Sequence, residues 1–263
     1  MNAPLLLDID LDYFFTPRQG QVWHPWRRFR AWNSPVHLLS GLRDRGISWE
    51  GAVVNVMQDH GEAYWRWAFA MDQGLPPTHG ATLVHVDAHS DWYRTVPKEI
   101  HAGNFILWAI KTGYISQVWW VLPDWMDWQA PDASRFLQKE PLGKPWVEGD
   151  ALCARVGTAT ARLVTLDKLP RFDRPARMVT LCSSPGYTPP AALPLWRDLL
   201  ERFGQDAERH SRIFAESLEQ YPMLRTLTDA VPALEMDQLL RVHRSRLSIA
   251  EAAWLHEVTE GAL

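Results

Sequence analysis

Residues 85–91 (HVDAHSD) close an apolar run and constrain this chain more than any other segment. Asp87, His89 and Asp91 occupy alternate positions, and alternate side chains of an extended backbone point to the same side. One imidazole between two carboxylates is a ligand set for a hard or borderline divalent cation. A strand that ends in this way predicts a metal-binding edge of a sheet.

A second segment, near the N-terminus, ends in a similar pattern. The apolar residues 5–7 are followed by Asp8, Asp10 and Asp12 at alternate positions. Two such clusters at strand ends predict one shared metal site, and this many carboxylates favours a pair of cations. We place Asp8 and Asp10 among the ligands, rather than Asp10 and Asp12, because Asp8 directly follows the apolar run. The alternative for these three aspartates is that they cap a turn.

The rest of the chain predicts strands that alternate with helices. A helix is expected from Pro35, with Ser34 as its N-cap, to about Gly46. The other expected helices are residues 61–73, 104–112, 195–203 and 249–258, and the expected strands are 4–10, 51–57, 81–87, 117–122 and 177–182. This order indicates an α/β fold with three αβα layers and a mostly parallel sheet.

We expect residues 1–263 to form a single domain, because no internal repeat or linker interrupts them. Residues 124–177 form a loop-rich insertion in this interpretation, with a hairpin near 151–166. Residues 191–263 are expected to be mainly helical.

Composition excludes several classes of protein. The 27 basic and 31 acidic residues give a net charge of −4, and no basic stripe indicates nucleic-acid binding. No apolar run approaches transmembrane length, so no membrane partner is expected. Cys153 and Cys182 form no CxxC pattern and are expected to be buried free thiols in a reducing compartment, which favours a cytoplasmic protein.

Further polar residues follow the other expected strands. Asp59 and His60 follow the strand at 51–57, and Ser183 and Ser184 follow the strand at 177–182. Ligands of parallel α/β sheets bind beyond the carboxyl ends of the strands. His60 alone is more typical of a helix start than of a ligand, but the clusters together favour a metal site.

Two histidines near the DAHSD segment are interpreted separately. His85 shares a face with Asp87 and His89 by strict alternation, and we expect a plain buried histidine there rather than a partner of the site. His101 lies in the loop before the helix at 104–112.

These motifs resemble those of a known superfamily. Residues 87–91 (DAHSD) resemble the DAHxD motif of arginases and agmatinases, Asp59-His60 resembles their Gly-Gly-Asp-His segment, and Asp8-Ile9-Asp10 resembles their Asp-x-Asp. The Asp-x-Asp lies near the end of an ordinary arginase and at the start here, as in a circular permutation.

Three longer segments make the chain more similar to an atypical, permuted arginase-like family. They are residues 8–14 (DIDLDYF), 100–105 (IHAGNF) and 184–189 (SPGYTP). That family includes peptide arginases, which turn arginine residues of ribosomal peptides into ornithine. The resemblance therefore implies an arginase/deacetylase-like fold with permuted motif order.

The resemblance also implies a manganese pair and roles for individual residues. The implied metal ligands are Asp8, Asp10, His60, Asp87, His89 and Asp91, with Asp8 and Asp87 shared between the two ions. Asp91 would in addition accept a proton and pass it to the leaving nitrogen. His101 would serve in proton transfer or in substrate hydrogen bonding.

The chain departs from ordinary arginases in two ways. The segment after the last core strand reads Ser183-Ser184-Pro185, without the acid that pairs with the guanidinium. Asp12, Asp59, Glu62 or backbone carbonyls would have to replace it. The loop that grips the α-amino and α-carboxylate groups of free arginine has no counterpart, as a peptide substrate would require.

We therefore expect a manganese-dependent hydrolase that converts arginine residues of a ribosomally made precursor peptide to ornithine and urea. The alternatives are a metal-dependent amide hydrolase of the deacetylase kind and an inactive module that binds peptide. His60 and Asp91 exceed what a single zinc needs, and an intact ligand set argues against an inactive module. The oligomeric state stays open, a homo-oligomer included.

Overall fold

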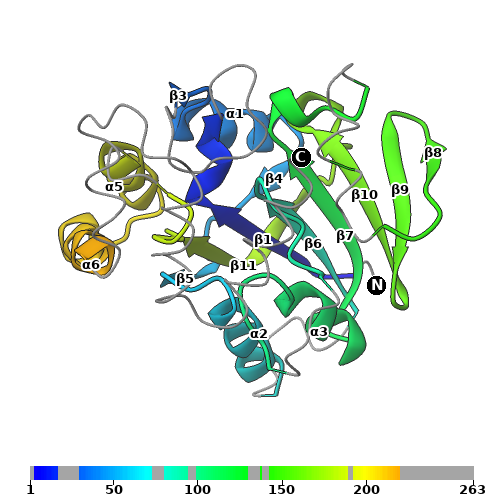
Figure 1. The fold of residues 1–263 in the computed structure, drawn as a ribbon, viewed down its shortest axis with the longest axis horizontal. Helices are drawn as coiled ribbons and strands as arrows, with labels where there is room; N and C mark the ends of the chain where they lie inside the picture. The colour runs from blue at the N-terminus through cyan, green and yellow to red at the C-terminus, as the bar shows by residue number, and fades with distance from the viewer. Residues whose placement is uncertain are drawn as a thin grey trace, which may run out of the picture.

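A nine-stranded sheet with helices on both faces forms the centre of the molecule (Figure 1). The computed structural model describes residues 3–16, 30–72, 80–93, 99–129, 137, 142–188 and 192–219. The sheet strands are β1 (Leu5–Asp10), β4 (Ile47–Ser48), β5 (Val53–Met57), β6 (Ala81–Val86), β7 (Ile115–Leu122), β8 (Trp146–Glu148), β9 (Ala151–Val156), β10 (Ala159–Thr165) and β11 (Arg174–Cys182). The helices are α1 (Pro35–Asp44), α2 (Glu62–Asp72), α3 (Phe105–Lys111), α5 (Leu193–Arg202) and α6 (Ala207–Glu219).

Short elements complete the described chain. They are the 3-10 helices η1 (Leu11–Phe14), η2 (Asp124–Met126) and η3 (Leu166–Lys168), and a two-stranded ribbon of β2 (Phe15–Thr16) and β3 (Arg30–Ala31).

The sheet is mixed but mostly parallel. Its order is β4-β11-β1-β6-β7-β10-β9-β8, and β5 pairs with β11 beyond the end of β4. Strands β1, β4, β5, β6, β7, β10 and β11 run parallel, whereas β9 pairs antiparallel with both β10 and β8 at one edge. The prediction of a mostly parallel sheet in an α/β fold is confirmed.

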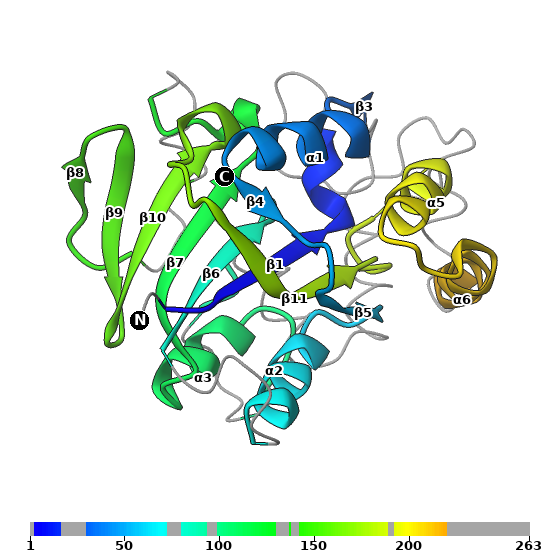
Figure 2. The same ribbon diagram turned by 180° about the vertical axis from the view of Figure 1, so that it is seen from behind.

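Two hydrophobic cores lie on opposite faces of this sheet. Helices α1 and α5 cover one face with Leu38, Leu42 and Trp196, and α6 adds Phe214 to the same core. Helices α2 and α3 cover the other face with Trp67 and Phe105. Figure 2 shows the two helix pairs on either side of the strands.

Most predicted elements are confirmed within the described residues. The N-cap of α1 is Ser34, whose Oγ accepts a hydrogen bond from the backbone N–H of His37 at 3.3 Å. The expected hairpin is the β9–β10 pair, and the segment 124–177 contributes β8, β9 and β10 to the sheet rather than loops alone. The helix expected at 249–258 lies outside the described residues.

Strand β1 ends at Asp10, as the expected strand 4–10 does, so Asp8 does not lie at the strand end where our argument for it as a ligand placed it. β11 and β6 pair with β1 on both sides, and the pairing with β11 reaches Asp10, opposite Cys182. Asp8 therefore lies inside the strand, whereas Asp12 lies in η1, just after its end. Pairing with β11 on one side and with β6 on the other keeps Asp8 within the strand despite its polar side chain.

Trp119 and Trp120 of β7 point to opposite faces of the sheet, as expected. Trp120 is fully buried, packs edge-on against Trp92 with ring centroids 5.3 Å apart, and donates its indole N–H to the carbonyl of Asp87 at 2.8 Å. Trp119 packs against Phe172 on the other face.

Trp120→Phe should lower the free energy of unfolding by about 1–3 kcal/mol, because the Asp87 carbonyl loses its donor in a buried place. Urea unfolding followed by tryptophan fluorescence and circular dichroism would measure the change. Trp119→Phe is the matched control and should cost less, since the partly buried Trp119 has no hydrogen bond to this loop. Equal losses in the two variants would contradict the role given to Trp120.

Candidate metal centre

The carboxyl ends of β1, β5, β6 and β11 meet at one edge of the sheet. Asp10 lies opposite Cys182 on the neighbouring strand, and Cys182 lies opposite Met57. The acidic and imidazole side chains gathered here are Asp8, Asp10, Asp12, Asp87, Asp91, His60, His85 and His89. All are buried except His89, whose side chain is 12 % exposed. The predicted clustering of the strand-end residues is therefore what the structure shows.

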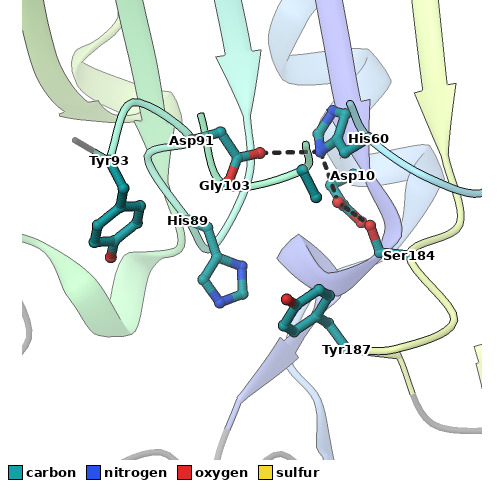
Figure 3. A pocket seen from close by; sticks show the side chains of 9 residues that line it. Asp10, His60, His89, Asp91, Tyr93, Gly103, Ser184 and Tyr187 are labelled. Atoms are coloured by element: carbon teal, nitrogen blue, oxygen red, sulfur yellow. Dashed lines mark hydrogen bonds and ion pairs between the residues drawn. The ribbon is translucent and has the colours of Figure 1, made fainter. Parts of the chain in front are cut away.

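Three carboxylates converge on one nitrogen of His60. Its Nδ1 lies 2.9 Å from an oxygen of Asp10, 3.2 Å from one of Asp87 and 3.2 Å from one of Asp91. Figure 3 shows two of these contacts, those with Asp10 and Asp91. Neither His60 Nδ1 nor Asp87 Oδ2 has a hydrogen-bond partner of acceptable geometry, although both are buried. Donor atoms that crowd together without hydrogen bonds are arranged like ligands around a common cation.

A second group forms around His89. Its Nδ1 lies 2.7 Å from Asp12 Oδ2 and 3.5 Å from Asp87 Oδ1. Asp87 thus directs one carboxylate oxygen to His60 and the other to His89. This is the arrangement expected of a carboxylate that two cations share.

Asp8 lies deeper than these ligand groups and is occupied by hydrogen bonds. Its Oδ2 accepts from His60 Nε2 at 3.0 Å and from His85 Nδ1 at 2.7 Å, and Thr180 donates its hydroxyl to Oδ1. Since Nε2 of His60 is the donor to Asp8, Nδ1 keeps the lone pair that a cation needs. A carboxylate that orients an imidazole in this way is common behind metal ligands.

Asp8 and Asp12 each belong to a group of side chains that could hold a metal ion, so our preference for Asp8 and Asp10 over Asp10 and Asp12 stays a prediction. Asp8, His60 and His85 also lie within 4.8 Å of one another, but their contacts are donor–acceptor hydrogen bonds. Asp12 Oδ2, by contrast, is buried without a hydrogen-bond partner. The hydrogen bonds of Asp8 would let it orient His60, and the comparison of variants below tests this role against that of a direct ligand.

His85 is buried as expected, but it is a partner of the site. Its Nδ1 contacts Asp8 and its Nε2 lies 3.0 Å from the carbonyl of His89. Both neighbours can only accept, so the ring donates from both nitrogens. Burial alone would lower the pKa of His85, but the charges of Asp87 and Asp8 raise it above the usual value. His85 therefore fixes the backbone at His89 and offsets carboxylate charge.

Burial and repulsion dominate the electrostatics of this cluster. Burial and the neighbouring carboxylates raise the pKa of Asp12 well above its usual range, and burial and the charge of Asp87 raise that of Asp91 to about 6. Burial opposes charge on His60, yet the surrounding carboxylates raise its pKa well above the ordinary value. Buried carboxylates need protons or cations to balance them. The donor set therefore fits divalent cations, and these buried Asp and His side chains could hold a metal ion.

A pocket leads to this cluster (Figure 3). Its lining residues are Asp10, His60, His89, Asp91, Tyr93, Ala102, Gly103, Ser184 and Tyr187. The ring of Tyr187 lies 5.3 Å from that of His89, and Ser184 donates its hydroxyl to Asp10 at 2.5 Å. Asp91 and Ser184 both have left-handed backbones, with φ of 53° and 39°. Non-glycine residues rarely adopt this conformation away from functional sites and turns.

The loop that carries His101 lies beside this pocket. His101 Nδ1 accepts a hydrogen bond from the N–H of Gly103 at 3.1 Å, and Asn104 accepts one from the N–H of His101 at 2.9 Å. A Cβ on Gly61 would lie 2.8 Å from the carbonyl carbon of His101, so only glycine lets this loop approach His60 so closely. Ala102 and Gly103 line the pocket, and the ring of His101 is held against Gly103.

Two proposed substitutes for the missing acid lie away from the pocket lining. Asp59 is exposed and accepts a hydrogen bond from the N–H of Gly61 at 2.8 Å. Glu62 pairs with Arg66 at 3.6 Å on the exposed side of α2. The pocket residues to which the sequence assigned no role include Tyr93 and Tyr187. Tyr187 lies in the turn-rich segment after β11, whereas no sequence signal marks Tyr93.

No comparison with known proteins assigns a role to this site, so its role is inferred from its geometry. A scan against protein-family models found no match, and searches of curated proteins and of solved structures found no significant match. Among the described residues, no helix is long and apolar enough to cross a membrane.

Asp12→Asn should remove the cation bound next to His89, because it deletes a carboxylate ligand. Asp8→Asn should retain the bound ions and weaken their affinity about 10–100-fold, the usual effect of a residue that orients a ligand. Elemental analysis after dialysis against Mn²⁺ would measure both. Greater metal loss in Asp8→Asn than in Asp12→Asn would restore Asp8 as the direct ligand.

Proposed function

We propose that this chain is a manganese-dependent hydrolase that converts arginine residues of a peptide to ornithine and releases urea. The observation that carries the proposal is the sharing of Asp87 between two ligand groups, one at His60 and one at His89. The motif resemblance to permuted arginase-like proteins supports the same reaction.

Each ligand group would hold one ion. His60, Asp10, Asp87 and Asp91 form the first group, and His89, Asp12 and Asp87 form the second. Carboxylate-rich sets with few imidazoles suit manganese. Cations bound there would lower the pKa of a coordinated water and stabilise charge on the reacting group.

Residues around the two ligand groups hold the ligand side chains and the nearby backbone in place. Asp8 fixes the ring of His60, while His85 and Trp120 hold the backbone carbonyls of His89 and Asp87. We assign to the pocket-lining carboxylate of Asp91 the proton taken from water and passed to the leaving nitrogen. His101 accepts the Gly103 N–H at Nδ1, so its ring proton sits on Nε2, the nitrogen that would donate to the substrate.

The pocket wall suits a flat cation more than a free amino acid. Tyr93 and Tyr187 lie on either side of His89, and aromatic faces attract guanidinium groups (Figure 3). Among the residues that the structure describes, the pocket lining includes no Lys or Arg to hold an α-carboxylate. This favours arginine within a peptide over free arginine.

Five tryptophans in or near the segment 124–177 do not line this pocket. Trp119 and Trp120 pack against the sheet cores, and Trp125, Trp128 and Trp146 are absent from the pocket lining. Aromatic contact with the substrate is therefore assigned to the two tyrosines.

A deacetylase-like amide hydrolase explains the site less well. Such an enzyme needs a single Asp-x-His pair and one further Asp around one zinc. Asp12, His89 and Asp87 would supply those ligands. His60 and its other two carboxylates, Asp10 and Asp91, would then have no role.

An arginine-containing peptide incubated with enzyme and Mn²⁺ should lose about 42 Da per conversion and release one urea, as expected for hydrolysis at a metal centre. Mass spectrometry and a urea assay would follow both products, with free arginine as the poorer substrate. Asp87→Ala should lose most of both metals and the activity. Fast urea release from free arginine with inert peptides would instead indicate an ordinary ureohydrolase, and loss of acetyl from acetyl-lysine peptides a deacetylase.

His101→Ala should lower turnover about 10²-fold, the usual effect of removing an acid–base group, and should leave the metal content unchanged. Turnover and elemental analysis on the same preparation would test this. His37→Ala, on the exposed face of α1, is the matched control and should retain full activity. Full activity in His101→Ala would show that His101 has no role in the reaction.

A further inference from the structure

Cys182 lies at the metal-binding edge, although the proposed reaction does not use it. It ends β11 opposite Asp10 of β1 and is fully buried. A carboxylate oxygen of Asp10, a ring nitrogen of His60 and the sulfur of Cys182 all lie within 4.8 Å of one another. An imidazole, a carboxylate and a thiol are therefore close enough to share one ion.

The present partners of this thiol are weak. Its sulfur lies 3.3 Å from the carbonyl of Gln58 and 3.3 Å from the hydroxyl of Ser184. Thiols form poor hydrogen bonds, so a cation would displace little. Beside it, His60 Nδ1 is buried without a hydrogen-bond partner, which is an independent sign that a ligand belongs there.

We propose that Asp10, His60 and Cys182 form a binding site for a thiophilic cation such as Cd²⁺ or Zn²⁺. Soft thiolate ligands select these ions, whereas manganese prefers oxygen and imidazole. In tetrahedral zinc sites the Zn–S and Zn–N bonds of about 2.3 and 2.0 Å separate sulfur from nitrogen by roughly 3.5 Å. The donor atoms of Asp10, His60 and Cys182 already lie within 4.8 Å of one another. The sulfur and the nitrogen would therefore have to approach each other by at most about 1.3 Å to reach that separation.

Binding exchanges the thiol proton for a metal–sulfur bond, and the proton leaves to solvent without any change of oxidation state. The thiophilic ion uses Asp10 and His60, which the manganese group also needs. The two kinds of cation therefore compete, and Cys182 sets the metal selectivity of the site. This inference does not depend on the substrate or on the hydrolytic reaction.

Titration of the metal-free full-length protein with Cd²⁺ alone provides the test. A thiolate-to-cadmium charge-transfer band in the ultraviolet should grow with the bound ion, and Cys182→Ser should abolish it. Cys182→Ser should also weaken Cd²⁺ binding about 10-fold or more while Mn²⁺ binding changes little, since only the sulfur ligand is lost. Retained Mn²⁺ binding shows in addition that the variant is folded.

Cys153→Ser is the matched control. The chain has only these two cysteines, and Cys153 is equally buried but lies on β9, separated from β11 by four strands of the sheet. The control should keep the band at full strength. The proposal is overturned if the wild-type protein binds Cd²⁺ without the band or does not bind it. It is also overturned if the band survives in Cys182→Ser, or if that variant weakens Mn²⁺ as much as Cd²⁺.

Discussion

Repulsion among five buried aspartates at one edge of the sheet is the constraint on which the rest of this structure depends. Asp8, Asp10, Asp12, Asp87 and Asp91 would not remain together in a dry site without compensating charge. Three histidines supply part of it, and each has a distinct geometry: His85 donates from both nitrogens, while His60 and His89 each present Nδ1 to carboxylates. The hydrogen bonds to Asp8 and to the His89 and Asp87 carbonyls then keep this arrangement in one orientation.

Much of this edge could be predicted from the sequence, because each cluster follows a strand whose apolar pattern is local. The positions of Asp87, His89 and His60 needed only the rule that parallel strands end together. The choice between Asp8 and Asp12 could not be made from the local pattern, because both carboxylates contact histidines that come from other strand ends. His85 was misjudged because its partner Asp8 is 77 residues away, and Cys182 carried no motif at all.

The unusual order of the motifs has a simple structural meaning. β1 lies between β11 and β6, so the first strand of the chain occupies the middle of the sheet. Its acids face those that follow β6 regardless of which segment comes first in the sequence. The same ligand edge could thus be built with the motifs in either order, so the motif order does not conflict with our functional proposal.

The central place of β1 also bears on how the chain is made. The segment Leu5–Asp10 leaves the ribosome before both of its neighbours, and β11 is complete only at Cys182, so one edge of this apolar strand stays unpaired while more than 170 further residues are made. Pairings this distant in sequence slow folding and expose strand edges to aggregation. The triad of Asp10, His60 and Cys182 is complete only when β1 and β11 have paired, so a thiophilic ion held by all three side chains would report that the centre of the sheet has formed.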